Sequence, residues 1–273
     1  MIRNLLYTCA ATTHSEEWRL NVERLCRYAS AFNGRKLISS RTGEGIHPPE
    51  VIEKAFAPLG SDVEFEHVPN DIYQAETVGF MDLLKRLESD NPNEITFHAQ
   101  TRGTRYKMLA EPFMESIRRW RNTAYDECLK DIPNIEKVLS KAACCGCFME
   151  RKPLVGTGKW YFWGSYWWVN HKALFTRLGW DQLPRKDYLA VEGYLGSLFT
   201  VDEAKCLYGL DPPDLYAAEM EFRCETDGCG NQFKKVMKRW ATLPEICAKC
   251  RKRRAVSVDG ITELPKEGYP YAK

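Results

Sequence analysis

The sequence has no apolar run long enough to cross a membrane. A spanning helix needs about 20 predominantly apolar residues, and the aromatic-rich run at residues 160–169 is short and broken by glycine. A secretory pattern is also missing, because polar residues follow the short apolar stretch at the start too soon. We therefore expect a cytoplasmic protein without a membrane span, or one in the host cytoplasm if the source is viral.

Internal repeats, low-complexity tracts and a strong net charge are absent as well. The formal net charge is only +2, from 39 Lys and Arg against 37 Asp and Glu, so the charge of the whole chain indicates no partner. Hydrophobic residues make up 44% of the chain, which is enough for a packed interior and argues against bulk disorder. With 273 residues, the chain exceeds one ordinary domain, and we expect a main domain with a small appendage.

Apolar runs alternate with amphipathic stretches over the first hundred residues. Each predicted strand is followed by a helical pattern, and Pro, Gly and Asn mark the turns between them. This rhythm predicts an α/β fold with a Rossmann-type, mostly parallel sheet covered by helices on both faces. The predicted strands are residues 4–11, 36–40, 63–68 and 94–99, and the predicted helices are residues 18–32, 49–59, 76–89 and 111–138.

The carboxyl ends of these strands are the expected ligand-binding edge. Parallel strands end at the same edge, so the loops after Thr8, Ser40, Val68 and His98 are expected to gather there. Further along, the Asp-Pro-Pro-Asp break at 211–214 is stiff and polar. It divides a predicted main domain, residues 1–215, from a tail, residues 216–273.

The tail holds two pairs of cysteines at the spacing of a zinc ribbon. Four residues (225–228) separate the first pair, two (248–249) separate the second, and 17 residues (230–246) lie between the pairs. Cysteines in a cytoplasmic chain are read as thiols and metal ligands, although two disulfides or four simple thiols are the alternatives. Four thiolates fill a tetrahedral zinc, which predicts a structural Zn²⁺ held by Cys224, Cys229, Cys247 and Cys250.

The tail is also basic. Residues 221–254 contain ten Lys or Arg and four Asp or Glu, an excess of six positive charges. This excess favours a polyanionic partner such as nucleic acid, with Phe233 and Trp240 available to stack on bases. A solvated charged face with core aromatics explains it equally well.

Three segments of the main domain have residues suited to catalysis or ligand binding. His98, Thr101, Arg102 and Arg105 follow the fourth strand, where Arg side chains and Gly103 suit a diphosphate. Residues 159–180 contain five tryptophans around Gly164-Ser165, so Ser165 with Trp163 or Trp167 is expected to line a sugar pocket. Glu192 lies among apolar residues, where burial would raise its pKa and suit it to act as a base. The alternatives are an ordinary exposed loop for the first segment, core packing for the second, and for Glu192 a partly exposed helix acid that caps the helix or pairs with a basic group.

These segments, taken in order, resemble a family of bacterial and viral glycosyltransferases. NLLYTCAA, FNGRK, VPND, TFHAQTRG, WGSYWWVNHKALF and AVEGYLGSLF, within residues 4–210, are similar to polysaccharide-assembly transferases of the rhamnan-synthesis type. That family has a His-x-Lys-Gly-like segment at a strand end, a G-x-F-W-W block and a later helix with Glu. Gln-Thr-Arg replaces the expected Lys in this chain, which leaves the phosphate contact open.

The resemblance implies a GT-A-like domain that transfers a sugar from a nucleotide-sugar donor to a hydroxyl acceptor. It implies Glu192 as the general base and Thr8, His98, Thr101, Arg102 and Arg105 as donor-binding residues. No convincing Asp-x-Asp stands where the family places one, so the need for a catalytic Mg²⁺ or Mn²⁺ stays open.

Three functions are compatible with the sequence. In the first, the basic ribbon docks a glycosyltransferase on polymeric DNA, such as the hydroxylated bases of a bacterial virus. In the second, the enzyme acts on a glycan or polysaccharide and the ribbon is structural. In the third, the protein binds nucleic acid without catalysis. The sequence does not indicate the sugar, the nucleotide or the oligomeric state.

Overall fold

The computed structural model describes residues 1–71, 74–104, 111–151, 159–185 and 189–209, with the backbone of three strands between residues 217 and 257. The chain divides into two compact units. The first contains Met1–Lys107 and Arg121–Leu210, and the second contains Met108–Trp120 and Asp211–Lys273. The predicted boundary at residue 215 lies outside the described residues, so it stays a prediction.

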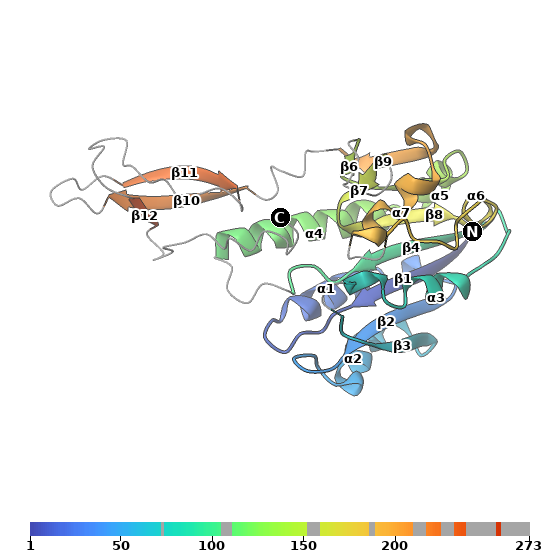
Figure 1. Ribbon diagram of the computed structural model, residues 1–273, viewed down its shortest axis with the longest axis horizontal. Coiled ribbons are helices and arrows are strands. Elements are labelled where there is room, and N and C mark those ends of the chain that lie inside the picture. The colour runs from blue at the N-terminus through green and yellow to red at the C-terminus, as the bar shows by residue number, and fades with distance from the viewer. Residues whose placement is uncertain are drawn as a thin grey trace. The chain divides into compact units, whose positions relative to one another are not determined.

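A seven-stranded sheet forms the centre of the first unit (Figure 1). Its order is β3 (Val63–Pro69), β2 (Lys36–Thr42), β1 (Ile2–Cys9), β4 (Glu94–Gln100), β8 (Trp167–Asn170), β5 (Cys144–Cys147) and β9 (Ala204–Tyr208). All neighbours pair in parallel except β8, which is antiparallel to both β4 and β5. The predicted mostly parallel α/β fold is therefore confirmed.

Both faces of the sheet are covered, which explains the continuous apolar character of its central strands. Six consecutive residues of β1, from Asn4 to Cys9, are buried. Leu6 packs into a core that includes Phe80, Val191 and Tyr194. Tyr7, on the opposite face, contacts Phe56 edge to face and hydrogen bonds to Tyr125. A strand that is buried on both faces therefore shows no alternation of apolar and polar residues.

The first two predicted helices begin within one residue of the predicted start, and each is a shorter α-helix followed by a 3₁₀ turn. The first is α1 (Glu17–Cys26), followed by the 3₁₀ turn η1 (Ala29–Ala31). The second is α2 (Pro49–Phe56), which begins with a proline at its first position and continues into η2 (Ala57–Leu59). Both lie close to the ranges predicted as helical.

Two predicted helices are each divided in the structure. The expected helix at 76–89 is a 3₁₀ turn, η3 (Ala75–Thr77), and a short helix, α3 (Phe80–Lys85), because Gly79 takes a left-handed conformation with φ 77°. The expected helix at 111–138 is α4 (Glu111–Leu129) and α5 (Ile132–Leu139). Asp131 caps α5 by accepting a hydrogen bond from the Asn134 N–H, and a proline follows at the start of this helix.

The aromatic block and the residues after it build the far side of the sheet. The elements are β6 (Met149–Glu150), β7 (Tyr161–Phe162), η4 (Trp163–Ser165), α6 (His171–Phe175), α7 (Ala190–Leu198) and η5 (Val201–Glu203). Helix α7 approaches β7 closely, since a Cβ at Gly196 would lie 1.7 Å from the Trp160 carbonyl oxygen. Only glycine permits this contact between two backbones.

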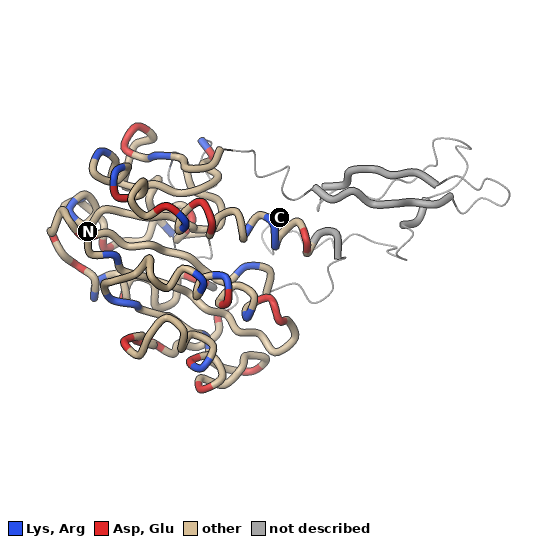
Figure 2. Tube along the Cα trace, turned by 180° about the vertical axis from the view of Figure 1, so that it is seen from behind, with Lys and Arg blue, Asp and Glu red and all other residues tan. Residues whose placement is uncertain are grey.

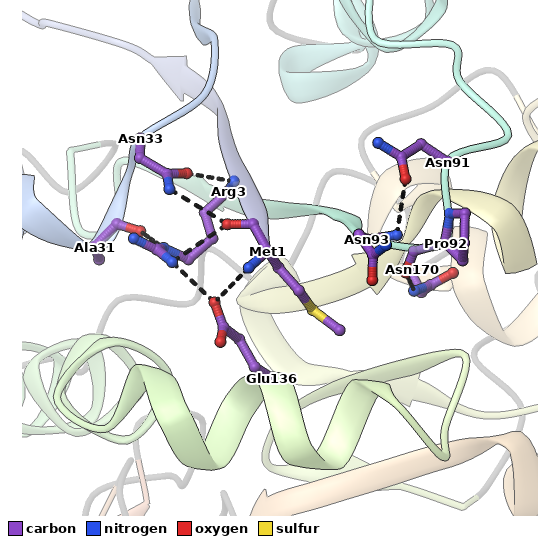
Figure 3. Close-up of polar contacts among 9 residues, drawn as sticks. All are labelled: Met1, Arg3, Ala31, Asn33, Asn91, Pro92, Asn93, Glu136 and Asn170. Atoms are coloured by element: carbon purple, nitrogen blue, oxygen red, sulfur yellow. Dashed lines mark hydrogen bonds and ion pairs between the residues drawn. The ribbon is translucent and has the colours of Figure 1, made fainter.

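Polar contacts close the amino ends of the strands (Figure 3). The Arg3 guanidinium donates to Glu136 Oε1 over 2.8 Å and to the Ala31 carbonyl over 2.7 Å, which connects β1 to α5 and η1. Asn170 Nδ2 donates to the Pro92 carbonyl over 3.0 Å, so the end of β8 is fixed to the loop before β4.

The second unit has its own small sheet of three antiparallel strands. Their order is β11 (Gln232–Lys238), β10 (Ala217–Cys224) and β12 (Ala255–Ser257), and Cys224 is in register with Ala255. Across the whole described part of the chain, no helix has both the length and the apolar character that a membrane span requires.

Candidate functional site

The carboxyl ends of β1 and β4 meet at the point where the order of the sheet reverses. From β1 the chain runs outward to β2 and β3, then returns to place β4 on the other side of β1. The Thr101 N–H donates to the Thr8 carbonyl over 3.0 Å, and the Ala10 N–H donates to Thr101 Oγ1 over 2.9 Å. Ligands in open α/β sheets bind at such a reversal, so this is the candidate site.

Arg102 is held at this edge through its backbone. Asn21 on α1 accepts from the Arg102 N–H over 3.0 Å and donates to the Arg102 carbonyl over 2.9 Å. This double contact fixes the main chain and leaves the guanidinium to extend from it. The side chain keeps 27% of its surface exposed, which makes it an accessible cation of the site.

The antiparallel direction of β8 brings the aromatic block to the same edge. Because β8 begins where β4 ends, the preceding turn at Gly164 and Ser165 lies at the carboxyl edge. Both residues have positive φ, 74° at Gly164 and 63° at Ser165, and the second value is unusual for a residue with a side chain. Tyr166 Oη donates to the Gln100 carbonyl over 3.0 Å and so fastens the turn to β4. Strained backbone of this kind concentrates at functional sites.

Glu192 reaches this turn from the first residues of α7. Its Oε1 accepts from the Gly164 N–H over 2.6 Å and lies 3.7 Å from Arg102 Nη2. Only 8% of the residue is exposed. Burial raises the pKa of this carboxyl, opposed by the Arg102 charge and the Gly164 hydrogen bond. The structure thus brings together two predicted site residues, Glu192 and Arg102, and the role of Glu192 as a base stays a prediction.

His98 lies behind the turn as a neutral ring. The side chain is fully buried, stacks on Trp167 with 4.7 Å between centroids, and hydrogen bonds from Nδ1 to the Ser165 carbonyl over 2.8 Å. A carbonyl only accepts, so Nδ1 has the proton, and no described group hydrogen bonds to Nε2. Burial lowers the pKa of His98 to about 4. The diphosphate contact predicted for His98 stays a prediction, and these contacts make the ring a support for the turn.

Two further charged residues at this edge were not singled out from the sequence. Glu76 on η3 is 4% exposed and accepts from Ser165 Oγ over 3.2 Å. Arg41, at the end of β2, is 1% exposed and donates to the Val78 carbonyl over 3.0 Å. Burial lowers the pKa of Arg41 to about 10, and the charge of Glu76 opposes that shift. Two signals in the sequence could have found them. Glu76 follows the loop after the third strand, and Arg41 lies near the end of the second strand.

The remaining predicted pocket residues occupy different depths. Ser165 and Trp167 are buried, and Trp163 is half-buried beside Tyr161 with 5.6 Å between centroids. Thr8 and Thr101 join the two strand ends as described, and Arg105 lies outside the described residues. Whether a tryptophan contacts a sugar therefore stays a prediction.

The predicted zinc ligands fall mostly outside the description. Cys224 ends β10, whereas Cys229, Cys247 and Cys250 are not among the described residues. Within the described residues, no three His, Cys, Asp or Glu side chains gather as ligands of a metal ion would. The structural zinc site therefore stays a prediction, and the need for a catalytic divalent ion stays open.

A cavity of about 300 Å³ lies away from the carboxyl edge, with Arg3, Tyr28, Leu129 and Lys130 in its lining. Its cations already have acidic partners, since Arg3 contacts Glu136 and Lys130 contacts Glu127. Basic and acidic residues are interspersed along the described part of the first unit (Figure 2). Neither feature competes with the carboxyl edge as a ligand site.

No protein-family model matches the chain, and a search of curated proteins finds no match. The geometry of the carboxyl edge is therefore the evidence from which a function is inferred.

Proposed function

We propose that the protein is a glycosyltransferase of GT-A-like fold that moves a sugar from a nucleotide-sugar donor to a hydroxyl acceptor. The observation that carries this proposal is the Glu192–Arg102 pair at the β1–β4 reversal. One buried carboxyl and one partly exposed guanidinium lie 3.7 Å apart. The carboxyl accepts from the Gly164 N–H, and Asn21 holds the main chain of Arg102. The resemblance of residues 4–210 to such transferases adds to it.

The two side chains have complementary roles in the proposed reaction. Glu192 accepts the proton of the acceptor hydroxyl as its oxygen attacks the anomeric carbon of the donor. The bond from that carbon to the diphosphate oxygen breaks, and its electron pair leaves with the nucleoside diphosphate. Arg102 stabilises the charge that develops on the leaving group. A raised carboxyl pKa suits this base, because proton transfer is most effective near the working pH.

A panel of nucleoside diphosphate sugars tests donor binding. The panel is applied to the full-length protein in a thermal-shift experiment, where a donor at 100 times its Kd adds about 2.7 kcal/mol. We expect a donor-specific rise in Tm that Arg102→Ala removes. The matched control is Arg35→Ala, which deletes a half-exposed arginine at the opposite edge of the sheet and is expected to keep the rise. No rise with any donor contradicts the proposal and favours a protein that binds nucleic acid only.

We propose that the tail, residues 216–273, is a four-cysteine zinc ribbon that holds a polymeric acceptor, with DNA bearing hydroxylated bases as the first candidate. The cysteine pairs support the ribbon, because they stand at the end of β10 and in the connections from β10 to β11 and from β11 to β12. The six excess positive charges support a polyanion.

Transfer to hydroxylated DNA and to an oligosaccharide, measured over a salt series, tests the acceptor. Binding through phosphates weakens steeply with salt, so transfer to DNA should fall steeply from about 50 to 200 mM salt. Transfer only to the oligosaccharide, with no dependence on salt, would instead identify a glycan transferase with a structural ribbon.

A further inference from the structure

Glu76 is an acid in a place where an acid is costly. Its side chain lies on η3, with 4% of the residue exposed, and acidic residues are almost never buried to this degree unless they are paired. Two groups face it from other elements. Ser165 Oγ donates to Glu76 Oε1 over 3.2 Å, and the Arg41 guanidinium interacts electrostatically with the same carboxylate.

The partner of Glu76 is itself unusual. Ser165 is fully buried and has a φ of 63°, which places a residue with a side chain in the left-handed region. Such backbone persists only where its surroundings determine it more than once. Both polar groups of Ser165 beyond its N–H are engaged, Oγ by Glu76 and the carbonyl by His98.

Glu192 binds the neighbouring residue of the same turn. Its carboxylate accepts from the Gly164 N–H over 2.6 Å, so adjacent residues of one turn are held by two different buried acids. The direction of the Gly164 N–H follows from the peptide geometry of the turn. A group that fixes Ser165 therefore also fixes the donor that orients Glu192.

We propose that Glu76 is a positioning residue of this site, which acts through Ser165 to keep the Gly164 N–H directed at the Glu192 carboxylate. The catalytic consequence rests on the proposed function, whereas the contact between Glu76, the turn and Glu192 does not. In the proposed reaction Glu76 would have a supporting role and no proton to transfer.

An influence through charge alone is the competing explanation, and it predicts the opposite sign. Several charged or titratable groups surround Glu192 and its turn: Arg102 after β4, Arg41 on β2, His98 on β4, Tyr166 beside the turn and Glu76 on η3. Removal of a nearby negative charge lowers the pKa of a carboxyl. Loss of the Gly164 hydrogen bond raises the pKa of Glu192, because that bond stabilises the ionised form.

The test is a ¹³C NMR titration of the Glu192 carboxyl in the full-length protein, assigned with Glu192→Gln. Ser165→Ala keeps the charge of Glu76 but removes the hydrogen bond from Ser165 Oγ to Glu76. We therefore expect it to raise the Glu192 pKa by about half a pH unit or more. Glu76→Gln removes the charge and keeps an acceptor for Ser165 Oγ, so no rise is expected. The Glu192 pKa should be higher in Glu76→Ala than in Glu76→Gln.

Thr77→Val is the matched control. Thr77 is the neighbour of Glu76 on η3, 8% exposed, and its Oγ1 donates to the Gln74 carbonyl over 2.8 Å, away from the turn. It should leave the Glu192 pKa unchanged. The proposal is overturned if Ser165→Ala leaves that pKa unchanged, or if Thr77→Val moves it as far. If Glu76→Ala does not fold, Ser165→Ala and Glu76→Gln still decide the question.

Kinetics then separate this proposal from the proposed function. We expect kcat for sugar transfer to fall about tenfold in Ser165→Ala with KM for the donor nearly unchanged, and Glu76→Gln to recover most of the loss in Glu76→Ala. Wild-type protein that transfers no sugar contradicts the function but leaves the titration result valid. Active wild-type protein whose Ser165→Ala variant keeps full kcat contradicts the positioning role alone.

Discussion

The two ends of the same strands treat buried polar groups differently. At the amino end, His171 Nε2 lies 2.6 Å from Thr96 Oγ1, and Asn4 uses both ends of its amide, with Oδ1 accepting from the Arg35 N–H and Nδ2 donating to Glu94. At the carboxyl end, the Glu192–Arg102 pair is 3.7 Å apart. Each end also has one histidine nitrogen without a hydrogen-bond partner among the described residues, His98 Nε2 at the carboxyl end and His171 Nδ1 at the amino end.

The amino end joins its buried polar groups mainly to one another. Short hydrogen bonds between buried groups favour a single arrangement. At the carboxyl end, a buried acid accepts one short hydrogen bond from backbone, and a partly exposed arginine lies 3.7 Å away. This contrast supports the proposal that ligands bind at the carboxyl end, whereas the contacts at the amino end hold the strands together.

The largest expected effect separates the two ends by activity. Glu192→Gln removes the proposed base and should lower the rate of sugar transfer by about 10²–10⁴-fold, the usual contribution of general-base catalysis. Glu94→Gln makes the same chemical change at the amino end, where Glu94 accepts from Asn4 over 2.8 Å, and should leave that rate within about twofold. Equal losses in both variants would show that the ends do not differ in function.

The next effect is a dependence of stability on pH, because each end of the strands has a buried histidine. Burial lowers the pKa of both His98 and His171 to about 4. The unfolded chain, with an ordinary histidine pKa near 6.5, then binds protons first as the pH falls. The contribution of the two neutral rings to the unfolding free energy is therefore fully present above about pH 6.5. It is lost as the pH falls toward 4, by about 3 kcal/mol for each ring.

Denaturant unfolding at several pH values measures this loss. His171→Gln and His98→Gln should each flatten the fall in unfolding free energy between pH 6.5 and 4. Because burial raises the pKa of Glu192, its protonation stabilises the folded state in the acid range, so the Glu192→Gln background isolates the histidines. A slope that neither histidine variant changes would contradict the assignment of both rings as neutral.

A smaller effect tests whether the site stands on a rigid frame. Gly196→Ala places a Cβ 1.7 Å from the Trp160 carbonyl oxygen, so α7 must move and we expect a loss of about 1–3 kcal/mol in unfolding free energy. Gly209→Ala is the control, because a Cβ there has nothing within 4 Å. Thermal unfolding compares them, and a Gly196→Ala protein as stable as wild type would show that α7 can shift freely.

The smallest effect lies at the surface near the amino end of β2. Glu64 contacts both Arg35 and Arg86, and all three side chains are about 40% exposed. Glu64→Gln should change the unfolding free energy by less than about 1 kcal/mol, with a difference that shrinks as salt is added. A larger and salt-independent loss would place this cluster with the buried contacts of the amino end.

The sequence predicts the first four strands closely because their signals are local. Apolar periodicity, together with Pro49 and the Asn33-Gly34 turn, places each boundary near the one observed. The breaks at Gly79 and Asp131 were missed although local chemistry marks both, a left-handed glycine in one case and a cap followed by proline in the other.

Strand β8 and the support of the site could not be predicted in this way. β8 has only four residues, all buried, so it shows neither alternation nor helical periodicity. Its position between β4 and β5 depends on pairing between distant segments. Arg102 and Glu192 were each predicted from their own segment, and their proximity was not. The contacts of Glu76 and Arg41 likewise depend on distant segments that no local pattern encodes.

The insertion of β8 between β4 and β5 also has a consequence for the order of folding. The site joins His98 to Ser165 across 67 residues and Glu76 to Ser165 across 89, so its contacts have far larger sequence separations than the pairing of β1 with β2. A growing chain forms its early parallel strands before the aromatic block has been synthesised. Recovery of the turn at Gly164 during refolding would therefore report that the whole first unit has been assembled.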